Sequence, residues 1–95
     1  MGMTNYEKVQ RWLEDHMLTD EVSITLFHNQ DYEGASVGIT EDHRAVYDYD
    51  KMVEALMRDD HMTQDEAVEW IDYNTIGGLQ GKPDEPIIMY TDLYD

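Results

Sequence analysis

Apolar residues recur at helical spacing in three stretches of the chain. The first stretch has four of them, three or four positions apart: Tyr6, Val9, Leu13 and Met17. Thr4 and Glu7 stand in the pattern of a capping box, in which each side chain accepts a hydrogen bond from the backbone N–H of the other residue. Together these features predict a helix that begins near residue 5.

The second and third helical stretches follow one another in the second half of the chain. The second can be capped by Asp48. Its apolar stripe consists of Tyr49, Met52, Val53 and Leu56. The third opens with another capping box, Thr63 and Glu66, and its end is predicted by Gly77 and Gly78. Its apolar residues are Ala67, Val68, Trp70 and Ile71.

Four short runs of strand-forming residues lie outside these helices. Residues 22–27 alternate between apolar and polar side chains, as a half-buried strand does. Residues 36–40 and 45–47 are separated by a polar turn, and residues 87–90 follow a loop that holds both prolines. We expect the first three runs to form an antiparallel meander.

The order of these elements, α-β-β-β-α-α-β, predicts the α+β class. We expect a small antiparallel sheet of about four strands with three helices on one face. Residues 1–95 are expected to form a single domain, whose acidic tail frays after about residue 91. Ten residues are expected to share one core: Val9, Leu13, Ile24, Leu26, Val46, Met52, Val53, Leu56, Val68 and Ile71.

The composition is strongly acidic, with 22 Asp and Glu against six Lys and Arg and a formal net charge of −16. Acidic chains are often disordered, but 41% hydrophobic residues, with aromatics among them, argue for a folded domain. The charge disfavours direct binding to nucleic acid and to anionic membranes. It favours a basic protein partner, or it serves solubility alone.

Residue usage also limits the chemistry and the location. The chain has no cysteine, which excludes disulfides, thiolate catalysis and cysteine-based zinc sites. No apolar run approaches the ~18 residues of a membrane span. There is no basic segment followed by an apolar one, as in a signal peptide. We therefore expect a cytoplasmic protein that does not associate with membranes.

The third predicted helix carries the most distinctive pattern. Asp65, Glu69 and Asp72 fall at i, i+4 and i+7, which places them on one side of the helix, and Glu66 and Tyr73 flank them. We call these five residues the acidic face. It is either a solvated surface, a row of carboxylates that matches a basic groove, or a cation site. Helix neighbours stand about 5–6 Å apart, broadly like successive phosphates, so the second possibility includes mimicry of nucleic acid.

Two aromatic residues of this helix have an ambiguous pattern. Trp70 and Tyr73 lie three positions apart, which favours a place in the core. The alternative is an exposed aromatic rim, because Trp and Tyr are common anchors of protein interfaces.

No motif predicts catalysis or a cofactor. The four histidines lack the spacing of a helical metal pair: His16, His28, His43 and His61. The carboxylates that bracket the second helix are interpreted as caps and exposed ends: Asp48, Asp50, Asp59 and Asp60. We expect no enzymatic activity, no metal and no cofactor. A metal-dependent hydrolase that uses Asp and Glu is the remaining catalytic alternative.

Two segments carry a resemblance to known proteins. Residues 45–53 and 62–76, followed by the strand residues 86–88, are similar to the pattern "VYDYDxMV…MTxEEAxEWIDYNT" and its short "PII" strand. This pattern resembles small acidic proteins of phages, prophages and Firmicutes, for which no activity is established. The chain departs from it at Gly77 and Gly78, where an Arg- or Ala-containing turn is expected. The resemblance implies a mobile-element origin.

These observations favour a non-enzymatic, acidic, phage-type protein in the cytoplasm of a bacterial host cell. It would bind a basic, nucleic-acid-handling host protein through Asp65, Glu66, Glu69, Asp72 and Tyr73. It would act as an inhibitor or DNA mimic, for example of a CRISPR effector. The alternative is a general protein-interaction module, homodimeric through its sheet edge, in which the acidity serves only solubility.

Overall fold

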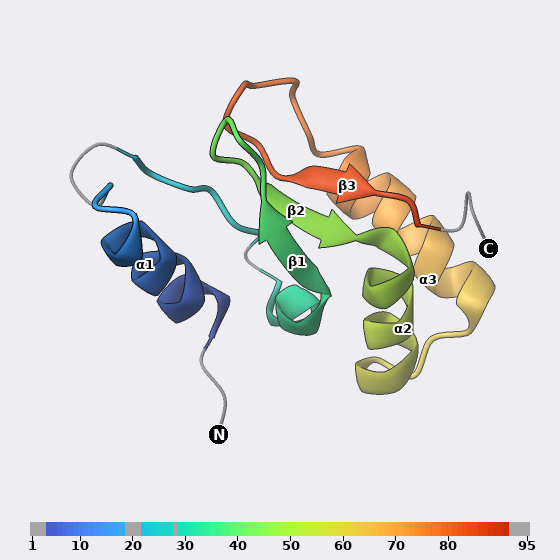
Figure 1. The fold of residues 1–95 in the computed structure, drawn as a ribbon. Helices are drawn as coiled ribbons and strands as arrows, with labels where there is room; N and C mark the ends of the chain where they lie inside the picture. Colours follow the sequence, from blue (N-terminus) through green and yellow to red (C-terminus); the bar gives the residue numbers. More distant parts are fainter. Residues whose placement is uncertain (1–3, 19–21, 28, 92–95) are drawn as a thin grey trace.

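A three-stranded mixed sheet lies at the centre of the structure, a computed structural model that describes residues 4–18, 22–27 and 29–91 (Figure 1). Its strands are β1 (Ser36–Ile39), β2 (Ala45–Asp48) and β3 (Ile87–Met89), in the order β1-β2-β3. Strand β2 pairs antiparallel with β1 and parallel with β3. The α+β class is confirmed, but the expected all-antiparallel sheet is wrong.

The two pairings of β2 follow from the two kinds of connection. β1 and β2 form a hairpin whose turn is closed by a 2.8 Å hydrogen bond from the Thr40 N–H to the Arg44 carbonyl. His43, within this turn, has a positive φ of 64°. β3 is reached only after two helices have carried the chain away from the end of β2. Such a crossover returns the chain to the end of the sheet at which β2 begins, so β3 runs parallel to β2.

The three predicted helices are present: α1 (Asn5–Asp15), α2 (Tyr49–Asp59) and α3 (Gln64–Trp70). Both predicted capping boxes are formed, at Thr4 and at Thr63. The Asp48 side chain caps α2 by accepting a hydrogen bond from the Lys51 N–H. Local capping chemistry therefore fixed the start of each helix.

Two further helical segments were not expected. A 3₁₀ helix, η1 (Gln30–Ala35), occupies the predicted loop before β1. Its N-cap is Asn29, whose side chain accepts a hydrogen bond from the Asp31 N–H. A π-helix, η2 (Ile71–Ile76), continues directly from α3 and replaces the second half of the predicted third helix.

The expected strand over residues 22–27 is absent, so the described residues hold three strands rather than four. The alternation did predict partial burial, because Ile24, Leu26 and Phe27 pack against the core. The backbone, however, joins no ladder. The Phe27 N–H donates instead to the Tyr47 hydroxyl at 3.2 Å. Alternating hydrophobicity therefore predicts which side chains face the core. It does not predict whether the backbone of the segment pairs with a strand.

The core lies between the sheet, η1, α2 and the α3–η2 segment. It consists of Tyr32, Ala35, Ala45, Tyr47, Met52, Val53, Leu56, Ala67 and Ile71. Four of the ten predicted core residues are only half-buried: Ile24, Leu26, Val46 and Val68. Val9 and Leu13 of α1 are buried outside this cluster, and Tyr6 and Met17 at the ends of their stripe are exposed.

The helices lie on two sides of β1. α2 packs against η1 and α3, whereas α1 stands on the opposite side of β1 from these helices (Figure 1). The α3–η2 segment packs against the core through Ala67 and Ile71, and its opposite side is exposed. The predicted fraying of the tail beyond residue 91 lies outside the described residues.

Candidate functional site

All five residues of the acidic face are exposed: Asp65, Glu66, Glu69, Asp72 and Tyr73. The core residues Ala67 and Ile71, both at 0% exposure, set this orientation because they hold the opposite side of the segment inward. Tyr73 is 82% exposed. The preferred assignment of Tyr73 to the core is thus wrong, and Trp70 beside it is half-buried against the core cluster.

Two carboxylates of the acidic face have partners within the chain. The Glu66 carboxylate accepts a 2.9 Å hydrogen bond from the Thr63 N–H, and this bond holds the pKa of Glu66 below its usual value. The Asp72 carboxylate accepts a 3.3 Å hydrogen bond from the Tyr49 hydroxyl. Burial, and then the charge of Asp72, raise the pKa of Tyr49 to about 12. The hydrogen bond to Glu66 therefore favours the charged form of that carboxylate.

Within the part of the chain that the structure describes, no Lys, Arg or His forms an ion pair with a carboxylate of the acidic face. The one ion pair among residues 4–18, 22–27 and 29–91 joins Arg58 to Asp59, outside the acidic face. The sequence has no Lys or Arg between residues 59 and 81. The carboxylates of the face are therefore available to a positive charge from outside the chain.

The π-helix shapes the C-terminal half of this surface. Its wider turn is closed by a 3.0 Å hydrogen bond from the Gly77 N–H to the Asp72 carbonyl, five residues back. A Cβ at position 77 would lie 2.5 Å from the Tyr73 carbonyl oxygen, so the turn requires glycine for close approach. Where α3 passes into η2, the Asn74 side chain donates a 3.2 Å hydrogen bond to the Trp70 carbonyl. Single π turns within helices often occur at functional sites.

Two open hollows flank the ridge that Glu69 and Tyr73 form. The first, which we call the Trp70 hollow, has a volume of about 450 Å³ and is lined by Met62, Glu66, Glu69, Trp70, Tyr73 and Asn74. The second has a volume of about 430 Å³ and is lined by Gln64, Asp65, Val68, Glu69, Asp72 and Tyr73. Each hollow thus combines apolar or aromatic walls with carboxylates at its rim.

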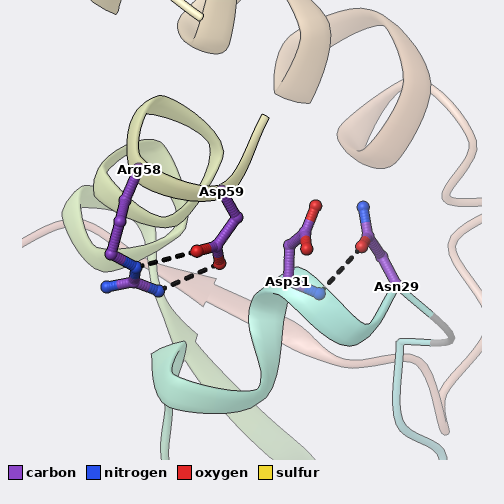
Figure 2. Close-up of polar contacts among 4 residues, drawn as sticks. All are labelled: Asn29, Asp31, Arg58 and Asp59. Atoms are coloured by element: carbon purple, nitrogen blue, oxygen red, sulfur yellow. Dashed lines mark hydrogen bonds and ion pairs between the residues drawn. The ribbon is translucent and has the colours of Figure 1, made fainter. Parts of the chain in front are cut away.

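A separate group of carboxylates lies where η1 meets the end of α2. Arg58 holds Asp59 through two hydrogen bonds of 3.0 and 3.1 Å, with Asp31 close by (Figure 2). A shared hydrogen bond with Asp60, partial burial and the charges of Asp60 and Asp59 raise the pKa of Asp31 from 3.8 to about 6. Asp31 of η1 therefore faces the carboxylates at the end of α2, across the contact between these two elements.

The histidines and the carboxylates do not converge on a metal centre in the described part of the chain, where no group of three or more such residues could hold an ion. His16 and His43 instead pack against Trp12, with ring centroids 4.1 and 6.0 Å away. His28 lies outside the described residues. Among those residues, no helix is long and apolar enough to cross a membrane.

Comparison of the chain with protein-family models, with curated proteins and with solved structures gave no match. The geometry of the α3–η2 surface therefore carries the functional argument.

The sequence predicted the acidic face but not the hollows beside it. Met62 lies before the helix and Asn74 lies within the π turn, so neither belongs to a helical stripe. Trp70 could be found from the sequence, because it belongs to the apolar pattern of the third predicted helix. Its neighbour Ile71 takes the buried position, which leaves the indole at the border of the core. The Asp31–Asp60 contact joins residues far apart in sequence, and no local pattern could predict it.

Proposed function

We propose that this chain is a non-enzymatic, acidic protein of phage type that binds a basic, nucleic-acid-handling protein of a bacterial host. The observation that carries the proposal is the α3–η2 surface, on which Asp65, Glu69 and Asp72 are exposed and unpaired with any cation of the described chain. A row of carboxylates on a helix spaces its charges about 5–6 Å apart, and a groove that binds phosphates can accept such a row.

When the host protein binds the acidic face, its phosphate-binding groove is occupied and can no longer bind nucleic acid. We therefore expect the chain to inhibit the host protein. A CRISPR effector is one host protein with such a groove. The net charge of −16 supports the proposal because it attracts a basic partner at long range and repels nucleic acid itself. The resemblance to small phage proteins supports this role, and for that reason we propose that the protein acts in the host cytoplasm.

Capture from bacterial lysate tests this proposal. The full chain is immobilised as wild type, as Glu69→Lys/Asp72→Lys and as the control Glu14→Lys/Asp15→Lys, which makes the same charge change at exposed positions near the end of α1. We expect a nucleic-acid-binding protein to be captured by the wild type and the control and lost from the α3–η2 variant. Duplex DNA and high salt should both release it.

Equal capture by all three proteins would contradict the proposal, because the acidic face would then contribute nothing that another acidic surface does not. Capture that resists both DNA and salt would contradict it as well.

The alternative, a homodimeric interaction module, has one observation in its favour. β1 and β3 are the outer strands of the sheet, and the exposed residues Val37, Met89 and Tyr90 lie on or beside them. Edge strands with apolar side chains can pair with a second copy. Sedimentation of the full chain over a range of concentrations distinguishes a dimer from a monomer.

A further inference from the structure

The Trp70 hollow has a chemical composition that the charge of the surface alone does not explain. Its walls are the indole of Trp70, the ring of Tyr73 and the thioether of Met62, and its rim holds the carboxylates of Glu66 and Glu69. A surface that served only solubility would need the carboxylates and not the aromatic walls.

The walls differ in how firmly they are held. Trp70 packs against the core cluster, so its position is fixed by the fold. Tyr73 is 82% exposed and projects from the π-helix, which places it on the rim of both hollows. An exposed tyrosine beside a fixed tryptophan offers two aromatic surfaces to one incoming side chain.

The carboxylates add a definite charge preference. Glu66 is held in position by the capping box, with its carboxylate on the Thr63 N–H, and Glu69 is exposed one turn further along. The residues that line this hollow include no Lys, Arg or His, so we expect a cation that enters it to come from another molecule. The matching side chain is therefore cationic at its tip and able to pack along an aromatic wall.

Arginine fits these requirements better than lysine. Its guanidinium is planar, is weakly hydrated, stacks on aromatic faces and bonds carboxylates through two donors, whereas a lysine ammonium is a compact and strongly hydrated point charge. We propose that the Trp70 hollow receives an arginine side chain of the basic partner, which contacts both Trp70 and Tyr73, stacks on the Tyr73 ring and pairs with Glu69. This inference rests on the proposed function and names the residue type by which the partner is held.

Peptide binding to the full chain tests the proposal without knowledge of the partner. The probes are hexa-arginine and hexa-lysine peptides, which have equal length and charge. In a Trp12→Phe background, Trp70 is the one remaining tryptophan, so its emission reports on the hollow directly. We expect the arginine peptide to bind about fivefold more tightly than the lysine peptide, and to change the Trp70 emission.

Variants at Tyr73 assign the preference to the hollow. Tyr73→Ala should abolish the arginine preference while the salt-dependent binding of both peptides remains, and Tyr73→Phe should retain the preference because the ring is kept. Tyr6→Ala is the matched control, because Tyr6 is an exposed tyrosine, at 66%, on α1. Both tyrosines are exposed, so their replacement leaves the core unchanged, and circular dichroism checks that each variant is folded.

The outcomes separate this inference from the proposed function. Equal affinity for the two peptides with unchanged Trp70 emission would overturn the arginine site and leave the acidic face as a binding surface. Absence of binding of either peptide at low salt would overturn both. A Trp70 emission that changes with protein concentration alone, together with dimers in sedimentation, would assign the hollow to a second copy of the chain and overturn the proposal.

Discussion

At the scale of single residues, the tyrosines divide into structural and exposed positions. Tyr32 and Tyr47 are each 1% exposed, and burial raises the pKa of both hydroxyls. The hydroxyl of Tyr47 accepts a hydrogen bond from the Phe27 N–H, and that of Tyr32 bonds the Thr75 hydroxyl at 2.8 Å. Each buried ring thus fixes an irregular segment to the core, and Tyr73 serves no such purpose.

Replacement of Tyr32 by phenylalanine should destabilise the fold. The variant keeps the buried ring but leaves the Thr75 hydroxyl without its partner, which costs about 1 kcal/mol of unfolding free energy. Urea denaturation measures this, with Tyr73→Phe as a control that should leave the midpoint unchanged. A Tyr32→Phe protein as stable as wild type would show that the bond between η1 and η2 contributes nothing.

At the scale of elements, the sequence predicted what local chemistry decides. Each helix starts at its predicted cap because the capping side chains lie within three residues of the backbone groups they satisfy. The prediction of a strand over residues 22–27 was wrong because strand pairing depends on a neighbour that is distant in sequence. The π-helix η2 was not predicted, because residues 64–76 fit the α-helical pattern of apolar positions up to the point where the turn widens.

Replacement of Gly77 by alanine tests what the π-helix requires. The added Cβ would lie 2.5 Å from the Tyr73 carbonyl oxygen and 3.2 Å from that of Asp72, so the backbone must shift. Crowding of this kind costs about 1–3 kcal/mol. Gly34→Ala is the matched control, because nothing lies within 4 Å of the Cβ it would add.

Chemical denaturation of the two variants gives the answer. The Gly77 variant should lose stability, and the Gly34 variant should keep or gain it because alanine restricts the unfolded chain. If both variants match the wild type, the π turn does not depend on glycine.

The candidate site was predictable to the same extent as the elements that carry it. The acidic face follows from the spacing of Asp65, Glu69 and Asp72 and from the burial of Ala67 and Ile71. The hollow between Met62 and Trp70 depends on how the chain enters α3 and on the π turn, and neither has a periodic signal. The charge of the surface is therefore predictable from local spacing, and its shape is not.

At the scale of the whole molecule, two features join residues that are far apart in sequence: the parallel pairing of β3 with β2, and the meeting of carboxylates from different elements. The order β1-β2-β3 brings residues 87–89 beside residues 46–48, with two helices between them in sequence. The same packing brings η1 against the end of α2, where Asp31 meets Asp60. One consequence of carrying 22 acids on 95 residues is thus a carboxyl pair that folding itself creates.

This pair should make the protein more stable near pH 5 than near pH 8. The shared bond with Asp60, burial and the neighbouring charges raise the pKa of Asp31 to about 6 in the folded state, against an ordinary value of 3.8. A raised folded pKa adds stability at low pH, and that stability is lost as the pH rises through about 6. Three carboxylates have a lowered pKa instead, through Arg58 at Asp59 and through backbone N–H groups at Glu66 and Glu85. Their contribution to the unfolding free energy is lost only at a pH below their ordinary pKa values.

The melting temperature should therefore rise from pH 8 to pH 5 in low salt, and added salt should shrink the rise. Asp31→Asn should flatten the curve between pH 5 and pH 7 and raise the melting temperature at pH 8, whereas Asp65→Asn, at an exposed position of α3, should leave the slope in that window unchanged. A slope that survives in Asp31→Asn would mean that the general repulsion among the carboxylates, and not this one contact, sets the pH dependence.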